Sequence, residues 1–243
     1  FYVFLVLSAF FKTWGADYTL VMKNFDYVFK YSMKPVADTL LIAVLAAPIG
    51  GILSMVVAFL VVRKRFVGRR LVEYVSMLGM AVPGTVFGLG YILTFNTKPL
   101  VLTNTLWILV IVLVMTRLPV GVRSGMSALR QIDPSIEEAA TDLGGSTAKV
   151  FSSITLPLIR PAFYTGLVFS FVKSMTAISA VIFLVSANYN LLTVRVMQHV
   201  DKGQFGYAAA LSVILMAIVF VAVGIMNFIL KRFGRSSDTN LMV

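Results

Sequence analysis

The strongest constraint in this sequence is a set of apolar stretches long enough to cross a lipid bilayer. A transmembrane helix needs about 20 mostly apolar residues. One stretch, residues 100–116, is at the short limit of that length. Four others are long enough to cross with some tilt: residues 36–62, 71–95, 161–185 and 207–230. We therefore predict an all-α polytopic membrane protein.

The composition agrees with a membrane protein and excludes an ordinary soluble domain. Of the 243 residues, 59% are hydrophobic and 13% are charged. Soluble domains average roughly 45–50% apolar and about 25% charged residues, so this chain has too little polar surface for a water-facing globule. The sequence contains no cysteine, which excludes disulfides, thiolate zinc sites and thiol nucleophiles.

Residues 1–11 are wholly apolar but too short to cross a bilayer. They lack an initial Met or a basic leader, so they do not resemble a signal peptide. We interpret them as the end of a longer, truncated helix and expect residues upstream of position 1. Residues 1–243 are then one transmembrane domain of about six helices.

The distribution of Lys and Arg predicts the orientation of the chain. Of the 21 basic residues, thirteen fall on the side of residues 63–70, 117–160 and the tail, seven fall on the other side, and Lys173 lies within a span. Cytoplasmic loops carry the excess of Lys and Arg, which places the first side and the C-terminus in the cytoplasm. The run RKRFVGRR at 63–70 alone would suggest nucleic-acid binding, but topology accounts for it, and we expect no nucleic-acid partner.

The loop at 133–158 is predicted to hold two short helices. Asp133 is placed to cap the first helix, with Pro134 at its first position. Gly144 and Gly145 end that helix, because glycine accepts the left-handed conformation of a C-terminal cap. Its apolar stripe has helical spacing and consists of Ile136, Ala139, Ala140 and Leu143.

The second predicted helix begins at Ser146, which is placed to cap it, and ends at Pro157. An amphipathic pair of this kind either lies on lipid, packs on the chain's own spans, or enters a groove on a partner. The first helix carries Glu137, Glu138 and Asp142, which disfavours an anionic leaflet. The other two alternatives remain open on physical grounds.

The spacing within this loop resembles a known family. Glu138-Ala139-Ala140, then Gly144 after three residues, then Ile154-Thr155-Leu156-Pro157 after nine more, is similar to the EAA loop of the membrane subunits of binding-protein-dependent ABC importers. The resemblance extends over roughly residues 36–230 and implies the type I ABC importer (MetI-like) permease fold. It implies that residues 133–158 are a coupling loop that docks on a separate ATPase subunit. The implied coupling residues are Glu138, Ala139, Ala140, Gly144, Ile154, Leu156 and Pro157.

The same resemblance implies the partners and the location. These are ABC ATPase subunits that bind ATP and Mg²⁺, a periplasmic or lipid-anchored binding protein, a second permease half or homologous subunit, and membrane lipid. The chain itself has no phosphate-binding G-x-x-x-x-G-K-[S/T] motif and no visible catalytic set, so we expect no enzyme activity and no bound cofactor. The expected location is the bacterial inner membrane, multi-pass, with the C-terminus in the cytoplasm.

Polar residues and helix breakers within the spans are candidates for the translocation path. Ser170, Lys173 and Ser174 share one face of the span 161–185, and Thr176 and Ser179 lie on adjacent faces. Pro83 allows the span 71–95 to break near mid-membrane. The alternatives are that small residues allow close helix packing and that Pro83 makes a plain kink.

Residues 174–196 resemble the permeases of ferric-iron importers, which commonly fuse two such halves. This chain would then be a C-terminal half that transports ferric iron. Permeases for 2-aminoethylphosphonate, polyamines or thiamine remain alternatives, as does a secondary transporter, although no inverted repeat is visible. No cluster of carboxylates or tyrosines indicates metal ligands, so any metal site is unknown. His199, the one histidine, is expected to be solvated in an outer loop.

Overall fold

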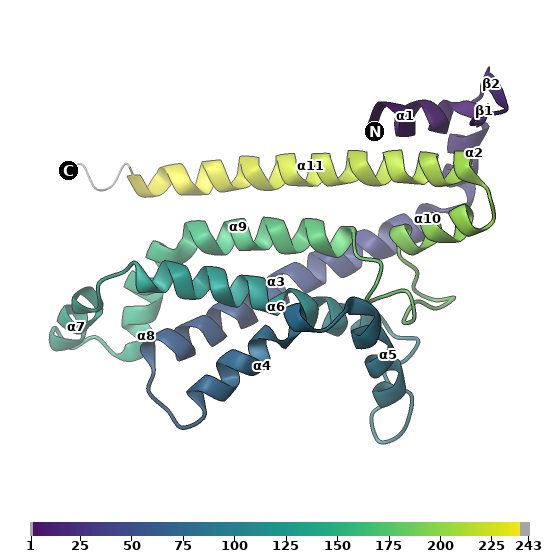
Figure 1. Cartoon of the computed structure of the whole chain (residues 1–243). Coiled ribbons are helices and arrows are strands. Elements are labelled where there is room, and N and C mark those ends of the chain that lie inside the picture. The colour runs from purple at the N-terminus through teal and green to yellow at the C-terminus, as the bar shows by residue number, and fades with distance from the viewer. Residues whose placement is uncertain (1, 239–243) are drawn as a thin grey trace. The chain divides into compact units, whose positions relative to one another are not determined.

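The structure is a computed structural model that describes residues 2–238, apart from the side chains of residues 147, 148 and 229–238. It begins with α1 (Tyr2–Phe10), an antiparallel hairpin of β1 (Phe11–Thr13) and β2 (Asp17–Leu20), and α2 (Lys23–Tyr31). Then follow α3 (Met33–Arg63), α4 (Arg69–Ala81), α5 (Gly84–Phe95) and α6 (Leu106–Arg130). The second half holds α7 (Pro134–Asp142), α8 (Thr147–Val150), a π-helical turn (Phe151–Thr155), α9 (Leu156–Met175), α10 (Leu192–Asp201) and α11 (Phe205–Asp238) (Figure 1).

Among residues 2–238, four helical segments are long and apolar enough to cross a membrane: Met33–Arg63, Leu106–Arg130, Phe151–Met175 and Phe205–Phe228. Helices α4 and α5 make a fifth span if they are counted together, with a break at Val82 and Pro83. The predicted all-α polytopic class is confirmed. The sixth expected span is represented in the structure by α1, a helix of nine residues.

The predicted span 161–185 is wrong at its C-terminal end, because α9 ends at Met175. The residues that follow form turns, in which Val181 N–H donates to the Ile178 carbonyl at 3.1 Å and Leu184 N–H to the Val181 carbonyl at 2.9 Å. Ala177, Ala180, Val181 and Leu184 are buried. Their apolar character therefore reflects packing within the protein, where irregular backbone is tolerated at membrane depth, and hydropathy cannot distinguish this from a span.

The predicted span 100–116 is also displaced, since α6 runs from Leu106 to Arg130. The sequence indicated an end before Arg117, where charges begin. The structure shows that an apolar stripe continues beyond it, because Leu118, Val122, Met126 and Leu129 are all buried. That helical spacing carries α6 through Pro119 and well past the apolar stretch.

The chain forms two compact units. The first unit contains residues 1–46, 83–113 and 171–229, and the second contains residues 47–82, 114–170 and the C-terminal end from 230. The core of the first unit joins α1, α2, α3, α10 and α11 through Ala9, Val28, Val36, Leu192 and Ala210. The core of the second unit joins α3, α6 and α9, and includes Val61, Val122, Leu129 and Ile159.

Candidate functional site

The first helix of the 133–158 loop begins as the sequence predicted. Asp133 is the N-cap of α7 and accepts a hydrogen bond from Ser135 N–H at 2.9 Å, and Pro134 occupies the first helical position. The hydrogen bond from the Ser135 backbone N–H holds the pKa of the Asp133 carboxyl below its ordinary value. The start of α7 is therefore fixed by local chemistry that the sequence already contains.

The end of α7 is a tight turn that needs two glycines. Gly144 N–H donates to the Thr141 carbonyl at 2.9 Å and Gly145 N–H donates to the Ala140 carbonyl at 3.0 Å, the pattern of a Schellman cap. Gly144 has φ +87°, as predicted. A Cβ on Gly145 would lie 2.7 Å from the Ala140 carbonyl oxygen, so this position also requires glycine. The sequence predicted that both glycines end the helix, but it implied a coupling role for Gly144 alone.

Glu137 anchors α7 to the rest of the second unit. Its Oε2 lies 3.0 Å from Arg63 Nε, at the end of α3, and its Oε1 accepts a hydrogen bond from Thr155 Oγ1 at 2.9 Å. The side chain of Arg63 is 11% exposed and that of Glu137 is 17% exposed. One carboxylate thus ties together three segments that are distant in sequence, and the spacing of the loop gave no indication of this.

Arg63 extends this anchor to the end of α6. Its Nη2 donates to the carbonyl of Leu129 at 2.9 Å and to the carbonyl of Ile132 at 3.0 Å. These carbonyls lie at and just beyond the C-terminus of α6, where they lack intrahelical donors. We call Arg63, Glu137 and Thr155 the anchor of α7. A displacement of α7 must therefore act on α3, on the end of α6 and on the start of the α9 span.

Two apolar side chains, one on α7 and one at its C-cap, are exposed. Leu143 is 89% exposed and Ile136 is 46% exposed. Glu138 and Ala139 are also exposed, whereas Ala140 is half-buried. The predicted stripe is therefore not packed on this chain's own spans within the described residues, and it remains open for a partner.

The second helix of the loop differs from the prediction, because Pro157 does not end it. Helix α8 passes through the π-helical turn 151–155 directly into α9, and Leu156 N–H donates to the Phe151 carbonyl five residues back. Proline lacks an N–H and clashes with the preceding turn of an α-helix, and a widened π turn relieves both conflicts. Ile154, Leu156 and Pro157 are half-buried at this junction. Phe151 packs edge-on against Phe59 of α3, with ring centroids 4.6 Å apart.

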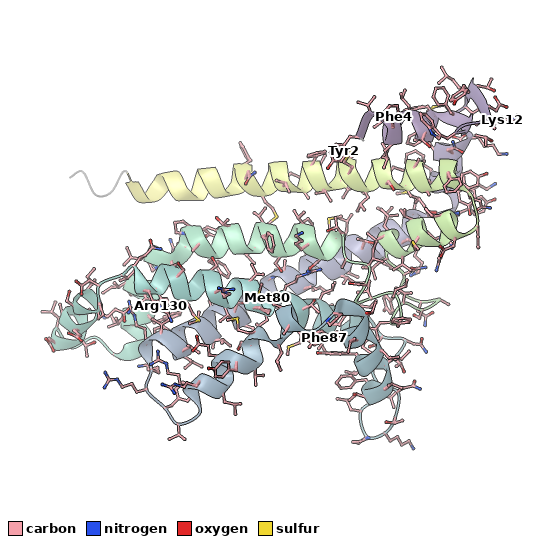
Figure 2. The ribbon with its side chains drawn as sticks, in the orientation of Figure 1. Tyr2, Phe4, Lys12, Met80, Phe87 and Arg130 are labelled. Atoms are coloured by element: carbon pink, nitrogen blue, oxygen red, sulfur yellow. The ribbon has the colours of Figure 1, made fainter. Side chains whose placement is uncertain are left out.

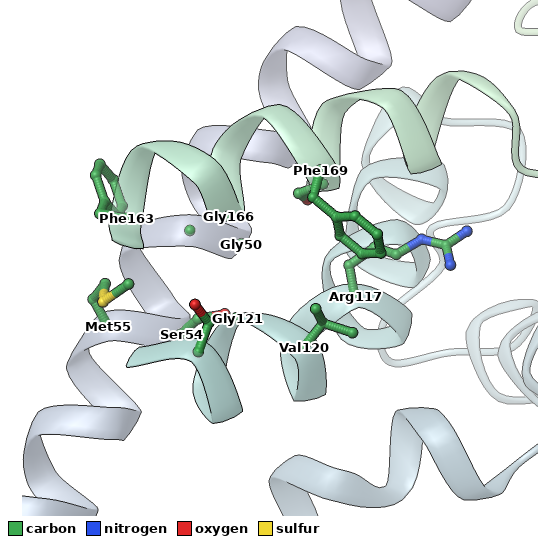
Figure 3. Close-up of a pocket in the computed structure, with 12 residues that line it drawn as sticks. Gly50, Ser54, Met55, Arg117, Val120, Gly121, Phe163, Gly166 and Phe169 are labelled. Carbon is green, nitrogen blue, oxygen red and sulfur yellow. The ribbon is translucent and has the colours of Figure 1, made fainter. Parts of the chain in front are cut away.

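One of the path candidates lies in the second unit. Ser170 lines a cavity of about 20 Å³ between α3, α6 and α9 that Gly50, Gly121, Phe163 and Arg117 also line (Figure 3). A volume of this size holds about one water molecule. Close packing surrounds it, because a Cβ on Gly51 would lie 2.7 Å from Leu167 Cδ2. The surroundings of Ser170 favour the alternative in which small residues allow helix packing.

The other path candidates lie in the first unit, around the break before α5. Pro83 is the N-cap of α5, and the next residue, Gly84, packs against Ser179. A Cβ on Gly88 would lie 2.6 Å from the Ala180 carbonyl oxygen. The break and the turn that follows α9 are therefore in direct contact, which brings Pro83 and Ser179 together.

The remaining three candidates have different surroundings. Lys173 and Thr176 are exposed, and Thr176 Oγ1 donates to the Val172 carbonyl at 3.0 Å. Ser174 is 1% exposed, and its Oγ has no hydrogen-bond partner among the described residues. An unpaired buried hydroxyl is costly, which makes Ser174 the most informative of the three.

His199 is buried, so the expectation of a solvated residue in an outer loop is wrong. It lies on α10, is 3% exposed, and its Nδ1 is 2.7 Å from Gln204 Oε1. Its ring contacts Tyr27 and Tyr207 edge-on, at centroid distances of 5.4 and 5.8 Å. Burial lowers the pKa of the His199 imidazole. The sequence could have indicated this burial, because His199 lies seven residues after Leu192 and therefore on the same face of an amphipathic helix.

Comparison with a family model places this geometry in context. Residues 46–235 match the model of the binding-protein-dependent transport system inner membrane component. This range includes the whole 133–158 loop, the three anchor residues and all six path candidates.

Two curated relatives and one solved structure extend the comparison. The chain is 39% identical over 221 residues to the ferric transport system permease protein FbpB of Actinobacillus pleuropneumoniae, covering 87% of this chain and 32% of that protein. It is 43% identical over 186 residues to the putative ferric transport system permease protein FbpB 1 of Haemophilus influenzae, covering 74% and 29%. The chain thus spans about a third of the length of these relatives.

The structural match supports the fold alone. A bacterial ABC transporter involved in the import of the acidic polysaccharide alginate matches with a TM-score of 0.80 at 15% identity, covering 95% of this chain and 88% of that chain. The ABC importer permease fold expected from the sequence is confirmed.

Proposed function

Since the chain belongs to the family of binding-protein-dependent transport system inner membrane components, we propose that it is the permease subunit of an ATP-driven importer for ferric iron. In this proposal, α7 docks on a separate ABC ATPase subunit. An external binding protein, periplasmic or lipid-anchored, delivers the substrate on the opposite side of the membrane. A second permease half or homologous subunit completes the passage.

The observation that carries the proposal is that α7 is anchored by one side chain while apolar side chains of the helix and its C-cap are exposed. Glu137 is held by the anchor with Arg63 and Thr155, whereas Ile136 and the C-cap residue Leu143 are exposed. An amphipathic helix that presents apolar anchors at helical spacing is the form that enters a groove on a partner. The rigid attachment favours a lever over a loosely tethered segment.

The anchor supplies the route by which ATPase movement reaches the membrane helices. ATP and Mg²⁺ bind the partner subunits, and closure of those subunits carries α7 with them. Because Glu137 contacts Arg63 of α3 and Thr155 before α9, the displacement acts directly on two spans. ATP drives the change between inward-open and outward-open states through its different affinity for the two. The chain itself supplies no catalytic group in this scheme and binds no cofactor.

For the passage of substrate we propose the surroundings of Pro83, with Lys173, Ser174, Thr176 and Ser179. A broken helix near mid-membrane frees backbone groups that line transport sites in other membrane proteins. The contact of Gly84 with Ser179 supports a joint role of the break and the turn after α9. Ser170 belongs to the other unit and is proposed as a packing residue.

Ferric iron is the proposed substrate because the two relatives described above carry the name of ferric transport permeases at 39% and 43% identity. Iron recognition is assigned to the external binding protein, so this chain treats the ion as cargo. The proposed location is the bacterial inner membrane, with α7 and the C-terminus on the cytoplasmic side.

The test is uptake in cells that lack the intact gene, complemented with the full-length protein. Radiolabelled ferric iron and 2-aminoethylphosphonate are compared in parallel, and ATP hydrolysis is measured on the purified complex. Wild type should restore iron uptake. Gly144→Leu should abolish uptake while membrane insertion and ATP hydrolysis persist, because a branched side chain opposes φ +87° at this position.

Gly144→Asn is the matched control, since asparagine tolerates the left-handed conformation and should retain most of the uptake. Normal uptake by an inserted Gly144→Leu protein would contradict the coupling role. Uptake of the phosphonate alone would contradict the iron assignment and leave the importer intact.

A further inference from the structure

A groove lies between α4 and α6, and none of the three anchor residues lines it. Its volume is about 790 Å³, and both of its walls belong to the second unit. Arg123 and Arg130 of α6 face it together with Glu73, Met77 and Met80 of α4. Neither the coupling scheme nor the passage proposed above uses this groove.

The character of the groove changes along its length. Helix α4 begins at Arg69 and α6 ends at Arg130, so Glu73 and Arg130 lie near the ends that adjoin the basic loops. Met77 and Met80 are farther along α4, towards the break before α5. Figure 2 labels Arg130 at the end of α6 near α7, and Met80 farther from α7, towards the break before α5. The groove is thus polar towards the basic side of the membrane, and towards the membrane centre methionines and Arg123 line it.

The two arginines are spaced along the groove. Arg123 precedes Arg130 by seven residues on one helix, which corresponds to two turns and a rise of about 10 Å. Met126, between them, is 6% exposed and forms the floor, whereas Met80 is 56% exposed at the edge. Methionine side chains are flexible and fill irregular apolar space, a property suited to a mobile hydrocarbon chain.

We propose that this groove binds one anionic phospholipid of the leaflet on the basic side. Its phosphate lies between the guanidinium groups of Arg130 and Arg123, and an acyl chain follows Met77, Met80 and Met126 towards the bilayer centre. Guanidinium groups bind phosphate through paired, charge-assisted hydrogen bonds. Basic pockets between transmembrane helices on the cytoplasmic side are the sites at which anionic headgroups bind.

The charges of the groove favour an anionic lipid over a zwitterionic one. Two arginines face one carboxylate, Glu73, which leaves an excess positive charge. A glycerol headgroup supplies hydroxyl donors for the Glu73 carboxylate and adds no positive charge near the arginines. Phosphatidylglycerol is therefore the probe of choice, with phosphatidylethanolamine as the zwitterionic comparison.

The experiment measures lipid retained by the full-length permease in complex with its ATPase subunits. The complex is incorporated into bilayers with equal amounts of the two lipids, extracted, and analysed by native mass spectrometry. Wild type should retain phosphatidylglycerol selectively. The double variant Arg123→Gln and Arg130→Gln should retain about tenfold less, because each lost charge-assisted hydrogen bond is a strong one.

Two control variants separate the effect of the groove arginines from the effect of the total positive charge on the basic side. Arg65→Gln combined with Arg70→Gln removes the same charge from exposed residues that do not line the groove, and should retain phosphatidylglycerol as wild type does. Arg123→Lys combined with Arg130→Lys should restore part of the retention. Elution as a monodisperse complex shows that each variant is folded.

Three results would overturn the proposal. Equal loss in both double Gln variants would indicate diffuse attraction to the basic side. Equal retention of phosphatidylethanolamine would contradict the preference for an anionic headgroup. Binding of inorganic phosphate to the delipidated complex, dependent on Arg123 and Arg130 while phosphatidylglycerol is not retained, would assign the arginines to a free anion.

Discussion

Arg63 and Glu137 join the end of α3 to α7 across 74 residues of sequence, with Arg63 Nε 3.0 Å from Glu137 Oε2. Glu138, the next residue, is exposed. The two adjacent carboxylates therefore have different surroundings, since Glu137 is paired with Arg63 and Glu138 is exposed. The attachment of α7 and its proposed docking are separate properties that different side chains control.

Glu137→Gln should loosen α7 and lower the stability of the second unit by about 1–3 kcal/mol, because a part-buried guanidinium loses its charged partner. Thermal unfolding of the purified complex measures this, and uptake should fall with it. Glu138→Gln is the matched control and should leave thermal stability unchanged. Equal thermal stability of the two variants would argue against the anchor.

Leu143→Ala should weaken binding of the ATPase subunit, because Leu143 is 89% exposed in the chain alone and is proposed to be buried at the interface. Burial of a leucine side chain is worth about 1.5–3 kcal/mol, and truncation to alanine forfeits most of it, so the dissociation constant should rise about tenfold. Co-purification and titration with the ATPase subunit measure the change. Val67→Ala, at another fully exposed residue on the same basic side, should have no effect, and a similar loss there would contradict the assignment.

Gly88→Ala should disturb the contact between α5 and the turn after α9. The new Cβ would meet the Ala180 carbonyl oxygen at 2.6 Å, and relief of such a clash costs about 1–3 kcal/mol. We expect lower thermal stability and reduced uptake. Gly90→Ala, on the same helix, meets no atom within 4 Å and should be neutral or stabilising by about 0.5–1 kcal/mol. The prediction is wrong if the two variants behave alike.

The buried His199 should make the stability of the first unit depend on pH. Because burial lowers its pKa in the folded state, the unfolded chain binds the proton more readily once the pH falls below about 6.5. The contribution of His199 to stability is therefore fully present above about pH 6.5. It decreases as the pH falls and levels off below the pKa of His199 in the folded state. The positive charges of Arg195 and Lys202 act in the same direction.

Thermal unfolding between about pH 8 and about pH 5 measures this dependence. Tyr27, Tyr207 and Gln204 surround the ring and should stay in place in a His199→Gln variant. That variant should lose the part of the pH dependence that His199 contributes below about pH 6.5. An unchanged profile would show that other groups determine it.

Much of the architecture followed from the sequence because its causes are local. A run of apolar residues predicts a span from its own length, and α3 and α11 lie where the runs 36–62 and 207–230 predicted. The start of α7 at Asp133 and its end at Gly144 follow from hydrogen bonds within a few residues. Such features can be predicted from the spacing of residues that are close together in the sequence.

Only the tertiary structure decided which polar residues have partners and where apolar stretches stop being helical. The role of Glu137 depends on Arg63, which is 74 residues away, and the burial of His199 depends on aromatic rings from α2 and α11. Residues 176–185 are as apolar as a span, yet they form turns in which Ala177, Ala180, Val181 and Leu184 are buried. An apolar side chain favours removal from water, and the tertiary contacts determine whether lipid or protein surrounds that side chain.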